Sequence, residues 1–150
     1  MEIKQFLDEI KSKKKHTKNR IVVGYLDSKV ISFLQERKIP IFSKEIYLTH
    51  KGLSHLSRHS KQKRGAGLSD SDILKIPEII QKPSAVYFDT KKEKLNLLYC
   101  AQTDNCFKFV KLVVDVNSYT NRKEKVTLIK TAGYIEAHNI EKNQEYVIVM

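Results

Sequence analysis

The chain is poor in residues that would cross-link it or hold it in a membrane. Among its 150 residues are only two cysteines, Cys100 and Cys106, too few for a disulfide framework. They flank residues 101–105 and could face each other across a hairpin, but we expect free thiols, since neither has the CxxC or Cys/His spacing of a strong zinc site. The longest apolar runs, such as 112–114 and 147–150, are far below the roughly twenty residues that cross a bilayer. We therefore expect no transmembrane helix.

Acidic residues are also scarce relative to basic ones. The sequence has 28 Lys and Arg against 17 Asp and Glu, which gives a formal net charge of +11. Such an excess favours a polyanionic partner, because basic side chains release the counterions that surround it. Nucleic acid is the expected partner, and an anionic membrane surface is the rival.

The length predicts a single domain over residues 1–150, because the chain can bury one real core but not two of ordinary size. No internal repeat is visible. The first residues, MEIKQFLDEIKSKKKH, contain neither a continuous apolar segment nor a small-residue cleavage site, so they do not resemble a secretory signal. We expect the mature protein to work in a cytoplasm.

The first half of the sequence has the apolar spacing of helices. We predict a basic N-terminal helix and tether over residues 1–20 and a mainly helical part over residues 21–84. Thr49 and Ser69 are suitable N-caps, and Pro77 is expected to kink or divide the helix in which it lies. The predicted helices cover residues 2–15, 30–37, 49–60 and 69–82, with short strands at 21–26 and 41–48.

From residue 85 onward the apolar period changes from 3.6 to 2. Four strands are predicted, over residues 85–89, 94–102, 106–116 and 125–135. The polar turns between them are too short for parallel crossovers, so neighbouring strands should be antiparallel. The fold class predicted is therefore α+β: N-terminal helices followed by a four-stranded antiparallel β-meander over 85–150, with 136–150 as a further edge strand.

One segment combines proton-exchanging and phosphate-binding side chains. The sequence THKGLSHLSRHSKQKR holds three of the five histidines of the chain within ten residues. Histidine exchanges protons near neutral pH, and guanidinium and ammonium groups hold anions. These are the parts of a metal-independent phosphodiester-cleaving site, although a solvated basic helix has the same composition. The residues concerned are His50, Lys51, His55, Arg58, His59, Lys61, Lys63 and Arg64.

The histidine pair and two tyrosines, which are candidates for the same site, also have simpler explanations. His55 and His59 are spaced i, i+4, as in a surface pair or two zinc ligands, but no HExxH glutamate and no obvious third ligand accompany them. Tyr119 lies in a polar turn and either stacks on a base or is an ordinary exposed aromatic. Tyr134 belongs either to the site or to the core and its rim.

The order of elements and the local text resemble a nuclease superfamily. A helical part with a histidine and basic residues, followed by four antiparallel strands, is similar to the group of barnase, EndoU, colicin-type and RelE nucleases. The text HLSRHSKQKRGAGLSDSDILKIPEIIQKPSAVYFD resembles its phage-associated members, as do KFVKLVVDV and VTLIKTAGYI. The resemblance covers about residues 46–135, and the first forty residues match nothing in the pattern.

This resemblance implies a metal-independent endoribonuclease that needs no cofactor, used as a toxin or phage effector. It implies that a base takes the proton of the 2′-hydroxyl, an acid protonates the leaving oxygen, and cations stabilise the phosphorane. His55 and His59 come first as catalytic residues, and Arg58, Arg64 and Lys111 would bind phosphate. Thr131 and Tyr134 would complete the cleft, and His50, Lys51, Lys61, Lys63 and Tyr119 would contact nucleic acid.

Two other functional classes stay open. A non-catalytic module with the same fold would grip RNA or DNA through the basic helix alone. A protein-interaction domain would use its basic face or a sheet edge to dock an acidic partner. An acidic inhibitor or antitoxin is also an expected partner of the enzyme, because a ribonuclease in a bacterial or phage-infected cytoplasm, or one delivered into a target cytoplasm, must not harm its own cell.

Overall fold

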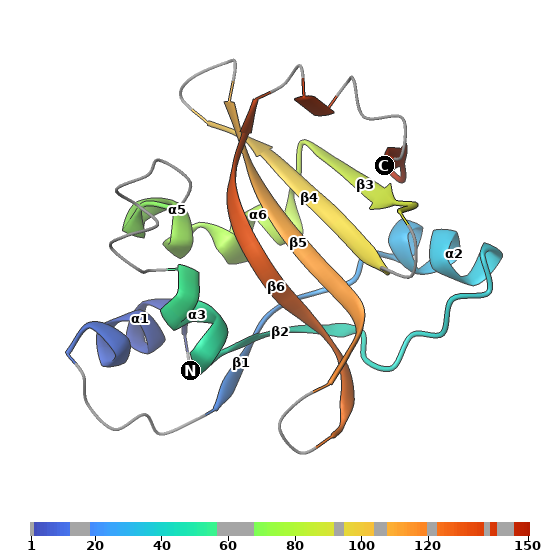
Figure 1. Ribbon diagram of the computed structural model, residues 1–150. Helices are drawn as coiled ribbons and strands as arrows, with labels where there is room; N and C mark the ends of the chain where they lie inside the picture. Colours follow the sequence, from blue (N-terminus) through green and yellow to red (C-terminus); the bar gives the residue numbers. More distant parts are fainter. Residues whose placement is uncertain are drawn as a thin grey trace.

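The structure is a computed structural model of the chain (Figure 1). It describes residues 2–12, 19–56, 68–91, 95–103, 108–119, 123–136, 139–140 and 146–150. Within these ranges, no helix is both long and apolar enough to cross a membrane. Cys106 lies outside them, and Cys100 is a buried free thiol.

Short helices and strands alternate in the first half of the chain, and strands follow in the second. The helices are α1 (Ile3–Lys11), α2 (Ser28–Glu36), α3 (His50–Leu56), α5 (Asp70–Leu74) and α6 (Ile76–Gln81). The strands are β1 (Arg20–Tyr25), β2 (Glu45–Thr49), β3 (Ala85–Asp89), β4 (Asn96–Gln102), β5 (Lys108–Tyr119), β6 (Lys125–Glu136) and β7 (Tyr146–Ile148).

The seven strands form one mixed sheet in the order β1-β2-β6-β5-β4-β3-β7. The α+β class is confirmed, but the predicted four-stranded antiparallel sheet is too small. Strands β3 to β6 are only its middle, because β1 and β2 join it at β6 and the C-terminal β7 pairs with β3. The β2–β6 pair is parallel. Its partners are some eighty residues apart in the sequence, so the short-turn argument did not apply to them.

Local sequence signals set several helix ends as expected. The Thr49 hydroxyl accepts a hydrogen bond of 2.9 Å from the amide of Gly52 at the start of α3. The Ser69 hydroxyl accepts one of 3.3 Å from the amide of Asp72 at the start of α5. Pro77 lies in the first turn of α6, just after the end of α5, so it divides the predicted 69–82 helix in two.

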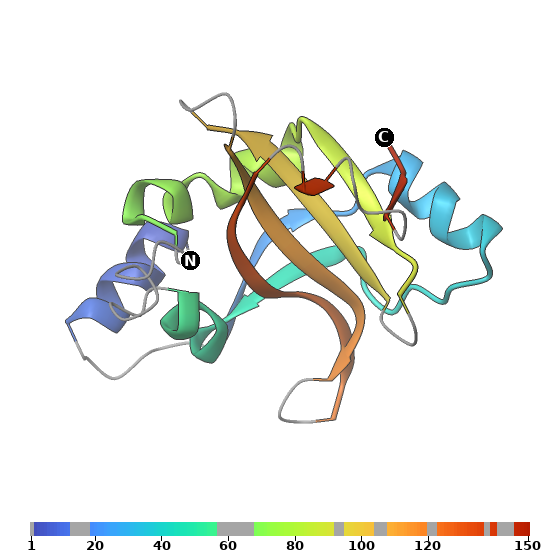
Figure 2. The same cartoon turned by 45° about the horizontal axis from the view of Figure 1, so that its top comes forward.

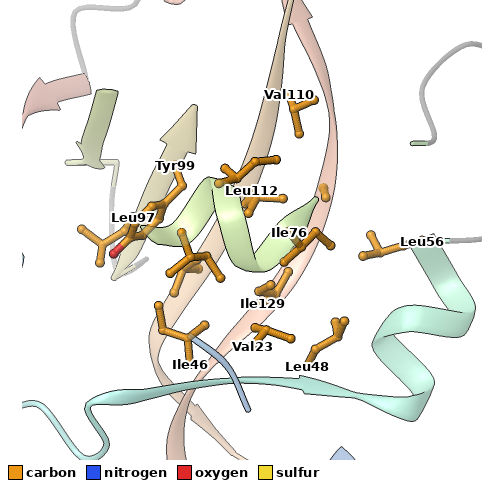
Figure 3. Packing of buried hydrophobic residues seen from close by; sticks show 14 of the residues in the cluster. Val23, Ile46, Leu48, Leu56, Ile76, Leu97, Tyr99, Val110, Leu112 and Ile129 are labelled. Carbon is orange, nitrogen blue, oxygen red and sulfur yellow. The ribbon is translucent and has the colours of Figure 1, made fainter. Parts of the chain in front are cut away.

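The helices cover one face of the sheet and build the main core there (Figure 3). Val110, Leu112 and Val114 point to this face from β5, and Ile76 of α6 packs among them. α6 approaches β1 very closely: a Cβ at Gly24 would lie 2.6 Å from the γ2 carbon of Ile80. Every helix contributes fully buried or nearly fully buried side chains: Phe6, Val30, Leu34, Leu53, Leu56, Ile73, Ile76 and Ile80.

The opposite face of the sheet carries a mixture of polar and apolar side chains. Along β5 they alternate with the core residues, as the pleat requires. Lys111 lies opposite Cys100 of β4, and Val113 lies opposite Leu98. Cys100, Leu98 and Val113 are buried although they are not part of the main core. This second face is therefore partly covered.

Candidate functional site

α3 follows β2 without a loop and is held between β6 and α1 (Figure 1). β2 pairs with β6 only at Thr127 and Leu128, and beyond that point α3 takes its place beside β6. Leu53 and Leu56 are fully buried, which fixes the face of this short helix. The helix therefore presents its remaining side chains in a defined orientation at the edge of the sheet.

The described part of the histidine segment divides into a packed and an exposed portion. His50 is half-buried in the first turn of α3, where its ring lies edge-on to Phe6 with ring centroids 5.6 Å apart. Lys51 and His55 are exposed. His55 can thus meet a substrate, whereas His50 lies between α3 and α1. The predicted residues Arg58, His59, Lys61, Lys63 and Arg64 lie outside the described residues.

Tyr134 of β6 is fixed by hydrogen bonds at the start of α5. Its hydroxyl donates to the carboxylate of Asp72 and accepts a hydrogen bond of 3.2 Å from the amide of Ser69. Asp72 also accepts one of 3.1 Å from the Ser69 hydroxyl, and its side chain is only 19% exposed. This Ser69–Asp72–Tyr134 cluster joins β6 to α5 on the helix-covered side of the sheet.

The partnership of Asp72 and Tyr134 could not be predicted from the sequence. Ser69 was expected as an N-cap, but a local capping signal carries no information about a tyrosine some sixty residues later. α1 also reaches this cluster, since Lys11 forms an ion pair with Asp70 of α5. Both side chains are about half exposed, so the pair contributes little stability on its own.

Lys111 and Thr131 do not lie with Tyr134. Tyr134 is the cross-strand partner of Val110 and shares its core-facing side. Lys111 is opposite Gly133, and Thr131 is opposite Val113, so both side chains point to the other face. Burial raises the pKa of the neighbouring Cys100 thiol to about 11, although the charge of Lys111 acts in the opposite direction. The predicted site residues are thus divided between the two faces of the sheet.

Tyr119 lies at the far end of β5, away from α3. It pairs with Lys125 at the start of β6, whereas Tyr134 is nine residues further along that strand, a separation of roughly 30 Å at about 3.3 Å per residue. Tyr119 is exposed, and the Lys125 ammonium lies 5.4 Å from its ring centroid. Tyr119 therefore does not lie together with Tyr134.

A metal site is not formed by the residues that can be placed. In the described ranges, no three His, Cys, Asp or Glu side chains gather closely enough to hold a metal ion.

Comparison with known proteins gives one match. The family model described as phage-Barnase-EndoU-ColicinE5/D-RelE like nuclease 3 matches residues 20–143. The match is wider than the resemblance seen in the sequence, because it begins at β1 and includes α2, while α1 lies outside it. No curated protein and no solved structure matches the chain significantly.

Proposed function

The chain belongs to this family of phage-associated nucleases, and on that premise we propose that it is a metal-independent endoribonuclease of the toxin or phage-effector kind. Nucleic acid is the substrate class that the family implies, and the net charge of +11 suits a polyanion. RNA is the substrate we propose, because a ribose supplies its own nucleophile, the 2′-hydroxyl.

The chemistry requires only a proton acceptor, a proton donor and groups that stabilise a crowded phosphorane. The base takes the 2′-hydroxyl proton while the 2′-oxygen attacks phosphorus, and the acid protonates the departing 5′-oxygen. The products are a 2′,3′-cyclic phosphate and a free 5′-hydroxyl. The observation that carries the proposal is the exposure of His55 on a helix that is fixed against β6.

We assign the proton transfers to His55 and His59. Arg58 and Arg64 are proposed to bind the phosphate, and His50, Lys51, Lys61 and Lys63 to support RNA binding along the same segment. Tyr134, held by Asp72, is proposed to line the helix side of the site. Because Lys111 and Thr131 point to the other face of the sheet, we give them contacts to parts of the RNA chain away from the scissile bond.

Two further expectations belong to this proposal. We propose that the enzyme acts in a cytoplasm, either where it is made or after delivery into a target cell. An acidic inhibitor protein would then mask the basic surface until the enzyme is needed, because the net positive charge of the enzyme attracts a negatively charged partner.

The test is cleavage of labelled total RNA in EDTA by the wild type, His55→Ala and His59→Ala, with end-group analysis of the products. We expect cyclic-phosphate ends from the wild type, no products from His59→Ala, and nearly unchanged RNA affinity for that variant. Lys51→Ala is the control from the same helix, and should weaken binding while leaving the chemical step intact. Tight binding by the wild type without any cleavage would instead make the chain a non-catalytic nucleic-acid-binding module.

A further inference from the structure

We propose that the surface around the far end of the β5–β6 hairpin is a second RNA-binding site, a stacking platform for single-stranded RNA. The platform consists of Arg20, Phe42, Tyr47, Tyr119 and Lys125. Its ligand rests on the proposed ribonuclease function, whereas its location rests on the structure alone. Figures 1 and 2 show this end of β5 and β6 extending beyond the neighbouring strands, at the opposite end from α5.

Two exposed aromatic rings flank one ammonium group on this surface. The Nζ atom of Lys125 lies 4.8 Å from the ring centroid of Phe42 and 5.4 Å from that of Tyr119. Phe42 is 45% exposed and Tyr119 is 60% exposed. The two rings come from segments more than seventy residues apart in the sequence, so the fold brings them to one cation.

A second cation lies on an aromatic ring nearby. The guanidinium of Arg20 is 4.3 Å from the ring centroid of Tyr47, and Arg20 also forms an ion pair of 3.3 Å with Glu124. Since Glu124 directly precedes Lys125, this ion pair joins the two cation–aromatic groups into one surface. Arg20, Tyr47, Tyr119 and Lys125 lie within strands, so the framework positions them.

Exposed apolar side chains are concentrated in the same region. Val22 of β1 is the cross-strand partner of Tyr47, and Tyr25 pairs with Glu45, so both share the face of Tyr47. Val22 is 42% exposed and Tyr25 is 65% exposed. Together with Phe42 and Tyr119 they are four of the six large hydrophobic side chains exposed in the described ranges. Exposed apolar side chains gathered in one region of the sheet are typical of a binding surface.

The chemistry of this surface favours single-stranded RNA over a protein partner. Aromatic rings stack on unpaired bases, and neighbouring Lys and Arg side chains neutralise the phosphates between them. Here the cations already lie on the rings, and the chain as a whole carries a charge of +11. α3 packs beside β6 at Ile129, four residues from Lys125 and roughly 13 Å away along the strand at about 3.3 Å per residue, so an RNA strand that stacks on this platform could continue toward α3. Long RNA would contact both surfaces, and a dinucleotide only one.

The experiment measures fluorescence anisotropy of a labelled single-stranded 2′-O-methyl RNA of twelve nucleotides, which 2′-hydroxyl attack cannot cleave. We expect the double variant Phe42→Ala and Tyr119→Ala to bind at least tenfold more weakly than the wild type, and Tyr119→Phe to retain binding because it keeps the ring. Leu74→Ala removes an exposed apolar side chain of α5 and serves as the control, with unchanged binding. Circular dichroism confirms that each variant is folded.

The outcomes separate this inference from the proposed function. If the wild type binds the oligonucleotide and cleaves RNA, but the double variant binds as tightly as the wild type, the platform is overturned and the ribonuclease stands. If the wild type cleaves RNA and the double variant loses only an acidic protein partner, the surface is a protein interface. If the wild type neither binds nor cleaves RNA, the ribonuclease proposal fails and the platform loses its ligand.

Discussion

At the scale of single residues, two tyrosines show how differently a phenol can be placed. Tyr99 of β4 is 1% exposed, and its hydroxyl oxygen has no hydrogen-bond partner among the described residues. Burial raises its pKa far above the ordinary value, and the charge of Asp27 adds to that rise. Tyr134 is half-buried and its hydroxyl is bonded to Asp72 and to the amide of Ser69. We therefore expect the first hydroxyl to cost stability and the second to contribute to it.

Replacing each tyrosine by phenylalanine should therefore have opposite results. Tyr99→Phe removes a buried polar atom that lacks a partner, so the free energy of unfolding should stay the same or rise by up to about 1 kcal/mol. Tyr134→Phe removes one of the two hydroxyl donors to Asp72 and the acceptor of the Ser69 amide, so it should lower that free energy by about 1–2 kcal/mol. Urea unfolding of the two variants and the wild type checks this. A clear loss of stability in Tyr99→Phe would show that its hydroxyl has a bonding partner.

The Cys100 thiol should make stability depend on alkaline pH. Burial raises its folded-state pKa from an ordinary value of 9.0 to about 11. Between these two values the unfolded chain releases the proton while the folded protein keeps it, so stability falls as the pH rises. The advantage of the wild type over Cys100→Ala, measured by urea unfolding, should shrink from pH 8.5 to pH 11. A constant difference over this range would contradict the burial of the thiol.

At the scale of elements, α1 is part of the core although the family match begins after it. Phe6 is fully buried and contacts the His50 ring, while Ile3 and Leu7 are nearly fully buried. α1 also forms the ion pair with α5. The helix therefore supports α3 and α5 from the side away from the sheet, and its loss would disturb the elements that carry the proposed site.

Truncation of Phe6 tests this role. Phe6→Ala should lower the free energy of unfolding by about 3 kcal/mol, because the cavity next to His50 cannot close fully. Lys4→Ala, on the exposed side of the same helix, is the matched control and should change stability by less than about 0.5 kcal/mol. Thermal unfolding followed by circular dichroism measures both. Equal stability of the two variants would mean that α1 does not pack on α3 in solution.

Local signals allowed most elements to be predicted, because helix caps, proline positions and apolar periods act over a few residues. The pairing of β2 with β6 and of β7 with β3 depends on contacts between distant segments, for which one sequence carries no local signal. The same limit applied to the site. The alternation of side chains along a strand could have predicted that Thr131 and Tyr134, three residues apart, face opposite sides of the sheet. The hydrogen bond between Tyr134 and Asp72 could not have been predicted in this way.

At the scale of the whole molecule, we propose two surfaces for RNA binding along β5 and β6. One is α3 with its exposed His55, beside Ile129 in the middle of β6, and the other is the platform of Arg20, Phe42, Tyr47, Tyr119 and Lys125 around the end of the hairpin. The excess of positive charge, +11 in total, attracts a polyanion to both. The α+β fold thus separates the proposed chemistry from part of the proposed substrate binding.

The most direct test of the ribonuclease proposal compares two labelled single-stranded oligonucleotides of the same sequence in EDTA, one all-RNA and one all-2′-O-methyl RNA. We predict that the wild type cleaves the RNA to products with 2′,3′-cyclic phosphate ends and leaves the methylated strand intact, because methylation removes the nucleophile. Cleavage of both strands, or cleavage of RNA only after magnesium is added, would contradict a mechanism in which the 2′-hydroxyl attacks without a metal ion.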